Sequence, residues 1–178
     1  NRWALMRNEH SENLCEHSVE VAVIAHALAV IGNKRFGKNL NGERAALMGL
    51  YHDTPETLTG DMPTPVKYYS EEVRLAYKTV EENACKSLVS MLPEDFREDY
   101  SSMFIPKNED EELWKLVKAA DKISALIKCI EEKKAGNTEF VKAGEGIKES
   151  VEKLDLPEAK VFVEEFLPAY EMTLDELR

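Results

Sequence analysis

The stretch that decides the fold of this chain is AALMGLYHD, at residues 45–53. Its first seven residues are apolar around every side of a helix, so we expect this helix to be central in the core. The run ends in His52-Asp53, directly before Thr54-Pro55, where two polar side chains have no packing reason to be. An adjacent His-Asp pair occurs by chance in roughly one chain in five. Its position, more than its presence, therefore indicates a functional site.

Helical periodicity continues outward from this stretch. Apolar residues recur at three and four positions in nearly every long segment, and no segment shows the sustained alternation and β-branched enrichment of a strand. The sequence therefore predicts an all-α fold, a single-domain bundle of about seven helices. The expected helices span residues 14–31, 42–52, 70–92, 94–101, 108–134, 138–153 and 157–167.

Capping residues mark where three of these helices begin. Asn13 with Glu16 has the spacing of a capping box. Asn108 with Glu111 has the same spacing. Asn41 is a candidate N-cap for the helix that contains the central stretch. Each of these side chains is expected to accept a hydrogen bond from a backbone amide in the first helical turn.

Other signals mark helix ends and turns. Gly32 with Asn33 is expected to end the first helix. Thr54-Pro55 reads as an N-cap followed by proline at the first helical position, so a short helical turn should start there. Residues 58–65, LTGDMPTP, read as a rigid loop.

Length and composition restrict the class of protein. We expect residues 1–178 to form one domain, and we expect a natural N-terminal segment that this sequence lacks, since Asn1 is not an initiator residue. The net charge of −11 argues against binding to duplex nucleic acid or an anionic membrane, so an anionic substrate would need a local cation. The longest apolar run, residues 21–31, is shorter than the ~20 residues of a membrane span. Three widely spaced cysteines suit a reducing cytoplasm.

His17 lies on an apolar face of the first expected helix. Leu14, Val21 and Ile24 share that face, because they stand three before, four after and seven after it. The ring is therefore expected to point into the core. Taken alone, His17 has the simpler interpretation of a buried histidine with satisfied hydrogen bonds.

Asp121 is harder to explain as a structural residue. Its helical neighbours are small, among them Val117, Ser124 and Ala125, so the carboxylate is expected to be buried with room around it. Burying an unpaired carboxylate costs several kcal/mol, and no basic residue falls at helical spacing on that face. A metal ion would supply the missing positive charge.

Two imidazoles and two carboxylates form a mixed nitrogen and oxygen donor set. Such a set suits one divalent ion such as Co²⁺, Mn²⁺, Zn²⁺, Ni²⁺ or Fe²⁺, and the sequence does not choose among them. Four ligands leave positions open for water and substrate. A bound ion would activate water and neutralise phosphoryl oxygens, so it is also the local cation that an acidic protein needs.

Glu56 is the candidate for general acid/base catalysis. It follows His52 by four residues and Asp53 by three in the expected helical turn, so it can reach the attacking water without being a ligand. The alternative is an ordinary first-turn acid that the helix dipole favours.

The order His17, His52-Asp53, Asp121 matches the H…HD…D signature of the HD-domain metal-dependent phosphohydrolases. More narrowly, the chain resembles the bacterial HD-domain 5'-deoxynucleotidases over nearly its whole length. The motifs that carry this resemblance are Arg2-Trp3, Met6-Arg7-Asn8, Glu16-His17-Ser18, Tyr51-His52-Asp53, Glu56, Leu58-Thr59-Gly60-Asp61 and Pro63-Thr64-Pro65-Val66-Lys67-Tyr68.

The resemblance implies a cytoplasmic homodimer of helical subunits that removes the 5'-phosphate from deoxyribonucleoside 5'-monophosphates with a divalent metal. It implies His17, His52, Asp53 and Asp121 as metal ligands. It further implies Glu56 as the catalytic acid/base and Arg2 as the residue that orients the phosphate. Whether Glu56 or Asp61 is the main acid/base stays open. Trp3 would lie by the sugar. The remaining implied residues of the nucleotide pocket are Asp61, Met62, Pro63 and Thr64.

Two alternatives stay open at this point. The substrate could be another nucleotide, such as a triphosphate, a cyclic nucleotide or an alarmone, because metal chemistry alone does not choose among them. A triphosphate calls for several cations near the metal, and only Arg2, Arg7 and Lys67 are available in the motif segments. The chain could also be a non-catalytic scaffold that a metal stabilises, but a closed structural site would need neither Glu56 nor Arg2.

Overall fold

The computed structural model describes residues 1–67, 69–105, 107–173 and 175–176, and every regular element in this part of the chain is helical. Seven of these α-helices are eight residues or longer, which confirms the predicted class and size of the bundle. They are α1 (Leu14–Phe36), α2 (Gly42–Tyr51), α5 (Glu71–Ser90), α6 (Arg97–Phe104), α7 (Glu111–Lys134), α8 (Phe140–Glu152) and α9 (Pro157–Glu165). The shorter ones are α3 (Glu56–Thr59), α4 (Thr64–Lys67) and α10 (Pro168–Glu171), with 3₁₀ turns at Glu94–Phe96 and Asn108–Asp110.

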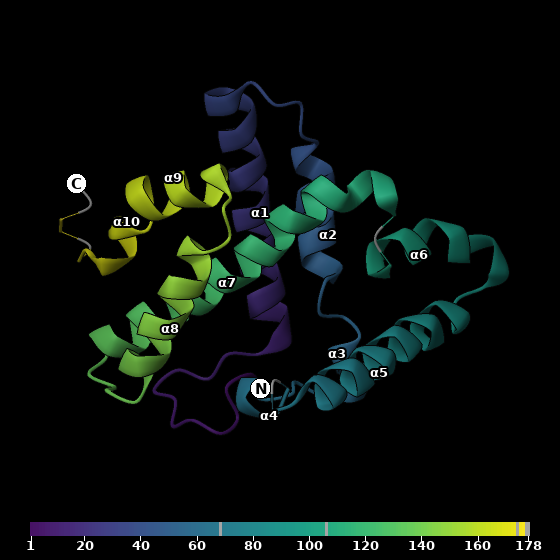
Figure 1. Ribbon diagram of the computed structural model, residues 1–178, viewed down its shortest axis with the longest axis horizontal. Helices are drawn as coiled ribbons and strands as arrows, with labels where there is room; N and C mark the ends of the chain where they lie inside the picture. The colour runs from purple at the N-terminus through teal and green to yellow at the C-terminus, as the bar shows by residue number, and fades with distance from the viewer. Residues whose placement is uncertain (68, 106, 174, 177–178) are drawn as a thin grey trace.

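The core lies where α1 and α7 cross, with α2 beside both of them (Figure 1). Val21, Ala25 and Leu28 line the buried face of α1 and are fully buried. Helix α8 covers α7, α9 packs on α1, and α5 and α6 extend away from the core. Residues 1–13 start beside Asp53, pass the loop between α7 and α8, and turn back to the start of α1 (Figure 1).

Helix α1 is longer than predicted. By length and composition alone it could cross a membrane. Here its buried side chains face α2, α7 and α9, which is the place of a core helix. The predicted capping box at its start is confirmed, because the Asn13 side chain accepts from the Glu16 amide and the Glu16 side chain accepts from the Asn13 amide.

The prediction that Gly32 ends this helix is wrong. Gly32 lies inside α1 and is buried, and the chain leaves the helix at Gly37, whose φ of 65° is left-handed. A Cβ at Gly32 would lie 2.6 Å from Leu40 Cδ1 and 2.9 Å from Glu158 Oε1. The glycine therefore permits close packing against α9 and the following loop, a tertiary requirement that no local stop signal expresses.

Helix α2 differs in part from its prediction. Asn41 caps it as expected, by accepting from the Arg44 amide. The helix is not enclosed on every side, because Leu47 and Leu50 are 39% and 41% exposed. Gly49 brings it close to α1, since a Cβ there would stand 2.9 Å from Ala22 Cα. This close approach places the end of α2 beside the start of α1.

The turn after α2 begins later than predicted. Thr54 does not cap a helix: its amide donates to the Tyr51 carbonyl within a turn, and α3 begins at Glu56 after Pro55. Residues 52–55 form tight turns directly after α2, so Thr54 does not have the extended backbone of an N-cap and α3 starts later. The predicted loop at residues 58–65 is likewise shorter, since its two ends belong to α3 and α4.

The predicted capping box at Asn108 is also absent. Residues 108–110 form a 3₁₀ turn, and Asp110 occupies the cap position of α7 without a side-chain capping bond. The Asp110 carboxylate instead accepts two hydrogen bonds from the guanidinium of Arg44, which ties α2 to the start of α7. Tyr68, a residue of the family motif, lies outside the described residues.

Candidate metal centre

Four polar side chains from three separate elements converge beside the N-terminal segment. His17 comes from the first turn of α1, His52 and Asp53 directly follow α2, and Asp121 lies in the middle of α7. One possible ligand atom from each lies within 4.8 Å of all the others. His17 Nε2 is 3.1 Å from Asp121 Oδ1 and 3.4 Å from Asp53 Oδ2. The structure thus brings together the four ligands predicted from the sequence.

The two imidazoles are oriented for metal binding. His52 Nδ1 lies 2.7 Å from the Gly49 carbonyl, which can only accept a hydrogen bond, so the proton is on Nδ1 and the lone pair is on Nε2. His17 Nδ1 lies 3.0 Å from Ser124 Oγ. Both Nε2 atoms are buried without a hydrogen-bond partner among the described residues. Two such atoms beside two carboxylates fit a divalent cation.

The electrostatics of the cluster favour positive charge at its centre. Burial alone would raise the pKa of Asp53, but His17 and His52 lower it far below its ordinary value. Burial acts against protonation of His17, yet the adjacent carboxylates of Asp121 and Asp53 outweigh it and raise the pKa of His17 to about 9. A proton and a metal ion therefore compete for the same nitrogen.

Asp121 is less buried than the sequence predicts. Its side chain is 41% exposed. The small neighbours on α7, such as Val117 and Ser124, are themselves buried but do not enclose the Asp121 carboxylate. Asp121 also has a basic partner from a distant part of the chain, which the spacing along α7 could not show. The guanidinium of Arg2 lies 3.9 Å from the Asp121 carboxylate.

Arg2 connects the N-terminal segment to the cluster. Its Nη1 donates to Asp53 at 3.0 Å and its Nε donates to Glu12 at 3.1 Å, while its amide donates to the Glu12 carbonyl. The side chain is mostly buried, with 13% exposed. Arg2 therefore lies next to the candidate ligands.

Trp3 is held from two sides. Its indole Nε1 donates to Glu12 at 3.1 Å, and its ring lies 5.3 Å from the ring of Phe140 on α8. The backbone of Trp3 has a φ of 57°, which is uncommon for a bulky residue and persists only where the surroundings enforce it. Packing of the N-terminal segment onto α8 is thus one role of this indole.

A buried polar network that the sequence analysis missed anchors the same segment. The Glu132 carboxylate, fully buried on α7, accepts from the amides of Glu9 and His10. Lys128 donates to Glu132 and to the carbonyl of His10. The only sequence signal was an acid four residues after a lysine, which is typical of an exposed helix face.

Glu56 is close to the donor group without belonging to it. It begins α3, and one of its carboxylate oxygens is buried without a hydrogen-bond partner among the described residues. Burial and the negative charges of Asp53 and Asp61 raise the pKa of Glu56 to about 8. A carboxyl group with this pKa can accept or give a proton near neutral pH.

The predicted pocket loop lies between α3 and α4. Asp61 is exposed, and Met62 and Pro63 are half-buried. For Thr64 the structure describes only its place in α4. The Gly60 carbonyl accepts from the Tyr77 hydroxyl of α5 at 3.2 Å, so α5 holds this loop in position next to Glu56.

The raised pKa of Glu56 predicts a pH-dependent stability difference. In chelator-treated protein, the folded state binds this proton more tightly than the unfolded chain, whose ordinary pKa is 4.5. The penalty for the buried charge is therefore absent below that pH and grows as pH rises through about 8. The free energy of unfolding of Glu56→Gln should exceed that of wild type by about 1 kcal/mol or more at pH 8.5, which corresponds to roughly 2–4 °C in Tm. At acidic pH the two proteins should be equally stable.

Thermal melts monitored by circular dichroism across this pH range provide the measurement. Glu72→Gln, an exposed change on α5, is the matched control and should leave Tm unchanged throughout. A Glu56→Gln advantage that is the same at every pH would contradict the assignment of the raised pKa to Glu56.

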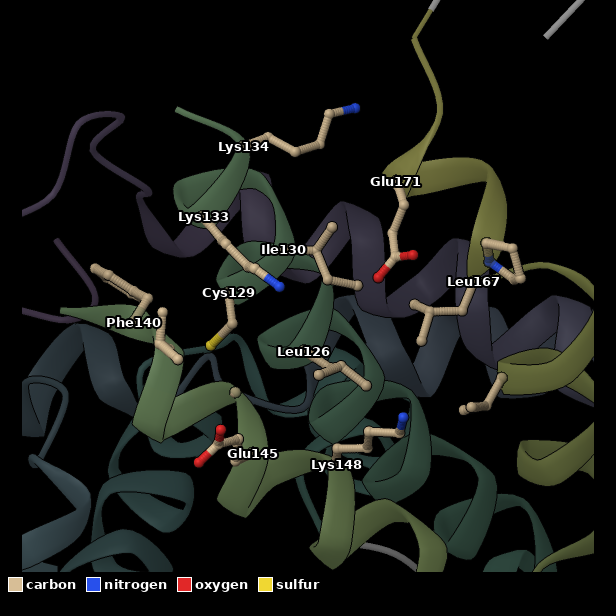
Figure 2. Close-up of a pocket in the computed structure, with 14 residues that line it drawn as sticks. Leu126, Cys129, Ile130, Lys133, Lys134, Phe140, Glu145, Lys148, Leu167 and Glu171 are labelled. Atoms are coloured by element: carbon tan, nitrogen blue, oxygen red, sulfur yellow. The ribbon is translucent and has the colours of Figure 1, made fainter. Parts of the chain in front are cut away.

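A separate surface groove of about 570 Å³ is lined by residues of α7, α8, α9 and α10. Figure 2 shows apolar side chains such as Leu126 and Ile130 among the charged side chains of Glu145, Lys148 and Glu171. None of the four candidate ligands lines it. The candidate metal centre is therefore independent of this groove.

Comparison with known proteins agrees with the geometry. The family model of the YfbR-like 5'-deoxynucleotidases matches residues 1–170. The chain belongs to this family. A 5'-deoxynucleotidase of Vibrio atlanticus is 49% identical over 99% of this chain and 91% of the relative. The 5'-deoxynucleotidase YfbR of Escherichia coli is 45% identical over 99% of this chain and 89% of the relative.

The fold of this YfbR-like family member also matches solved structures. An HD-domain phosphohydrolase from Listeria innocua superimposes with a TM-score of 0.82 at 26% sequence identity, over 95% of this chain and 82% of that one. The resemblance to the HD-domain phosphohydrolases that the sequence motifs indicated is thereby confirmed.

Proposed function

We propose that this protein is a divalent-metal-dependent 5'-nucleotidase that hydrolyses deoxyribonucleoside 5'-monophosphates to deoxyribonucleoside and phosphate. The observation that carries the proposal is the group of four donor residues, His17, His52, Asp53 and Asp121, whose ligand atoms lie within 4.8 Å of one another. They occur in a chain that belongs to the 5'-deoxynucleotidase family and matches it over nearly its whole length.

In this proposal the four donors hold one divalent ion. The mixed nitrogen and oxygen set accepts Co²⁺, Mn²⁺, Zn²⁺, Ni²⁺ or Fe²⁺. When bound, the ion supplies an activated water nucleophile and neutralises charge on the phosphoryl oxygens. The Gly49 carbonyl fixes the ring of His52 for this purpose.

Glu56 is proposed as the main acid/base, with Asp61 as the second candidate. The pKa of Glu56 is raised to about 8, so its carboxylate can take a proton from water and its carboxylic acid can return one to the leaving 5'-oxygen. The negative charge of Asp61 helps to raise the pKa of Glu56. Arg2 is proposed to orient the phosphate, because its guanidinium reaches the cluster and stays charged.

The surroundings favour a monophosphate over a triphosphate. Arg7 is exposed, and Lys67 already forms an ion pair with Glu81 at 2.9 Å. Arg2 is thus the one motif cation that lies on the donor cluster among the described residues. Phosphate release from a panel of deoxyribo- and ribonucleoside 5'-mono- and triphosphates, each with several divalent ions after chelation, tests the proposal. Activity only on triphosphates would overturn it.

A preference for deoxyribose is predicted to depend on Trp3. A bulky indole can leave a 2'-hydroxyl desolvated and unpaired, at ~1–3 kcal/mol, or roughly tenfold or more in kcat/KM. We expect Trp3→Ala to narrow the kcat/KM ratio for dAMP over AMP. Arg2→Ala should depress both substrates together, because both carry the same 5'-phosphate.

The matched control is Trp114→Ala, which removes a half-buried indole from α7 two turns before Asp121. It should lower stability without changing the ratio. If a well-folded Trp3→Ala protein keeps the wild-type ratio, the indole only packs the N-terminal segment against Phe140, and Thr64 becomes the candidate selector.

A homodimer and a cytoplasmic location remain predictions from the resemblance. Analytical ultracentrifugation of the purified protein would test the first, and cell fractionation the second.

A further inference from the structure

We propose that Ser124 and Glu20 form a relay that positions His17 for metal binding. Ser124 Oγ lies 3.0 Å from His17 Nδ1 and donates to Glu20 Oε2 at 2.5 Å. The imidazole and the hydroxyl are both fully buried. The inference rests on the metal site proposed above, in which neither Ser124 nor Glu20 is itself a ligand.

The chemistry of the three groups assigns each proton. An ionised carboxylate can only accept, so the single hydroxyl proton of Ser124 points to Glu20. The Ser124 oxygen must then accept from His17, which puts a proton on Nδ1 and leaves Nε2 for a cation. His17 Nε2 is the atom that faces Asp121 and Asp53 and has no hydrogen-bond partner in the described part of the chain.

Within the described residues, no other hydrogen-bond acceptor for His17 Nδ1 is close enough to replace Ser124. Glu12 Oε1 lies 4.0 Å from His17 Nδ1, beyond hydrogen-bond distance. The other carboxylate oxygen of Glu12 already accepts from Arg2 and Trp3. Ser124 is therefore the partner that determines the orientation and tautomer of the His17 ring.

The relay uses the same two helices as the ligands it supports. Glu20 follows His17 by three residues on α1, and Ser124 follows Asp121 by three residues on α7. Residues at this spacing lie on one helix face. Each helix thus supplies one metal ligand and one supporting side chain, and the hydrogen bond from Ser124 to Glu20 fixes the two helices relative to each other at the site.

Metal affinity measures the relay directly. Co²⁺ alone, titrated calorimetrically into chelator-treated protein, should bind Ser124→Ala and Glu20→Met roughly 10–100-fold more weakly than wild type, the usual effect of losing a partner behind a ligating histidine. Glu20→Gln should retain nearly wild-type affinity, because its amide oxygen still accepts from Ser124. The visible absorption of the bound Co²⁺ should change in Ser124→Ala and Glu20→Met only.

Two matched controls separate positioning from general effects. Ser18→Ala removes another buried serine hydroxyl from α1, and Glu131→Met removes another acid near Glu20. Neither forms a hydrogen bond with Ser124 among the described residues, so both should keep wild-type affinity. Folded Ser124→Ala and Glu20→Met proteins with wild-type Co²⁺ affinity and spectrum would overturn the relay alone, whereas a wild-type protein that binds no Co²⁺ would overturn the metal site itself.

Discussion

The Asp121→Ala protein is expected to bind no stoichiometric divalent cation and to release no phosphate from dAMP. Asp121 Oδ1 lies 3.1 Å from His17 Nε2, so the carboxylate and the imidazole face the same point. Without Asp121, the remaining donors are two imidazoles and Asp53, and Asp53 already accepts from Arg2. His52→Ala and Asp53→Ala are expected to give the same result.

Metal content by mass spectrometry and phosphate release are measured on the same preparations. Asp99→Ala, an exposed aspartate on α6, is the control and should keep both properties. Removing a metal that stabilises the folded state should also lower Tm in the ligand variants. Stoichiometric metal in an active Asp121→Ala protein would contradict the ligand assignment.

Glu56→Ala is expected to lose a factor of roughly 10²–10⁴ in kcat while keeping its metal, the usual weight of general acid/base catalysis. Acid/base catalysis and metal binding should be separable, because Glu56 begins α3 next to the four donors but is not one of them. The loss should appear in kcat with little change in Co²⁺ affinity.

Asp61→Ala serves as the comparison, because Asp61 is the other acidic candidate and is exposed in the loop after α3. A larger loss of kcat in Asp61→Ala than in Glu56→Ala would make Asp61, and not Glu56, the main acid/base. If Glu56→Ala instead loses its metal, Glu56 is a ligand and the proposed division of roles is wrong.

The parts of this structure that depend on local chemistry could be predicted from the sequence. Asn13 and Asn41 cap helices as expected, because a side-chain oxygen satisfies an amide only a few residues away. His17 was expected on the apolar face of its helix, and it is fully buried. The grouping of the four donors followed from residue type and the family motif, and the structure places them within 4.8 Å.

The parts that were wrong or missing depend on contacts between distant segments. Gly32 looks like a helix end, but it is needed because Leu40 and Glu158 lie against it. Lys128 and Glu132 look like an exposed pair, yet they are buried because the N-terminal segment lies over them. Ser124 looked like a small neighbour of Asp121, and only the fold shows that Glu20 and His17 meet there.

The anchoring of the N-terminal segment imposes an order on how the site is completed during synthesis. Residues 1–13 are synthesised before every helix of the bundle, but the side chains that hold them, Lys128, Glu132 and Asn137, are made more than a hundred residues later. The nascent segment has no docking surface until α7 and the start of α8 have formed. Asp121 belongs to the same helix as Lys128 and Glu132, so neither the group of four candidate donors nor the anchor of the segment that carries Arg2 can be complete before α7 has been made.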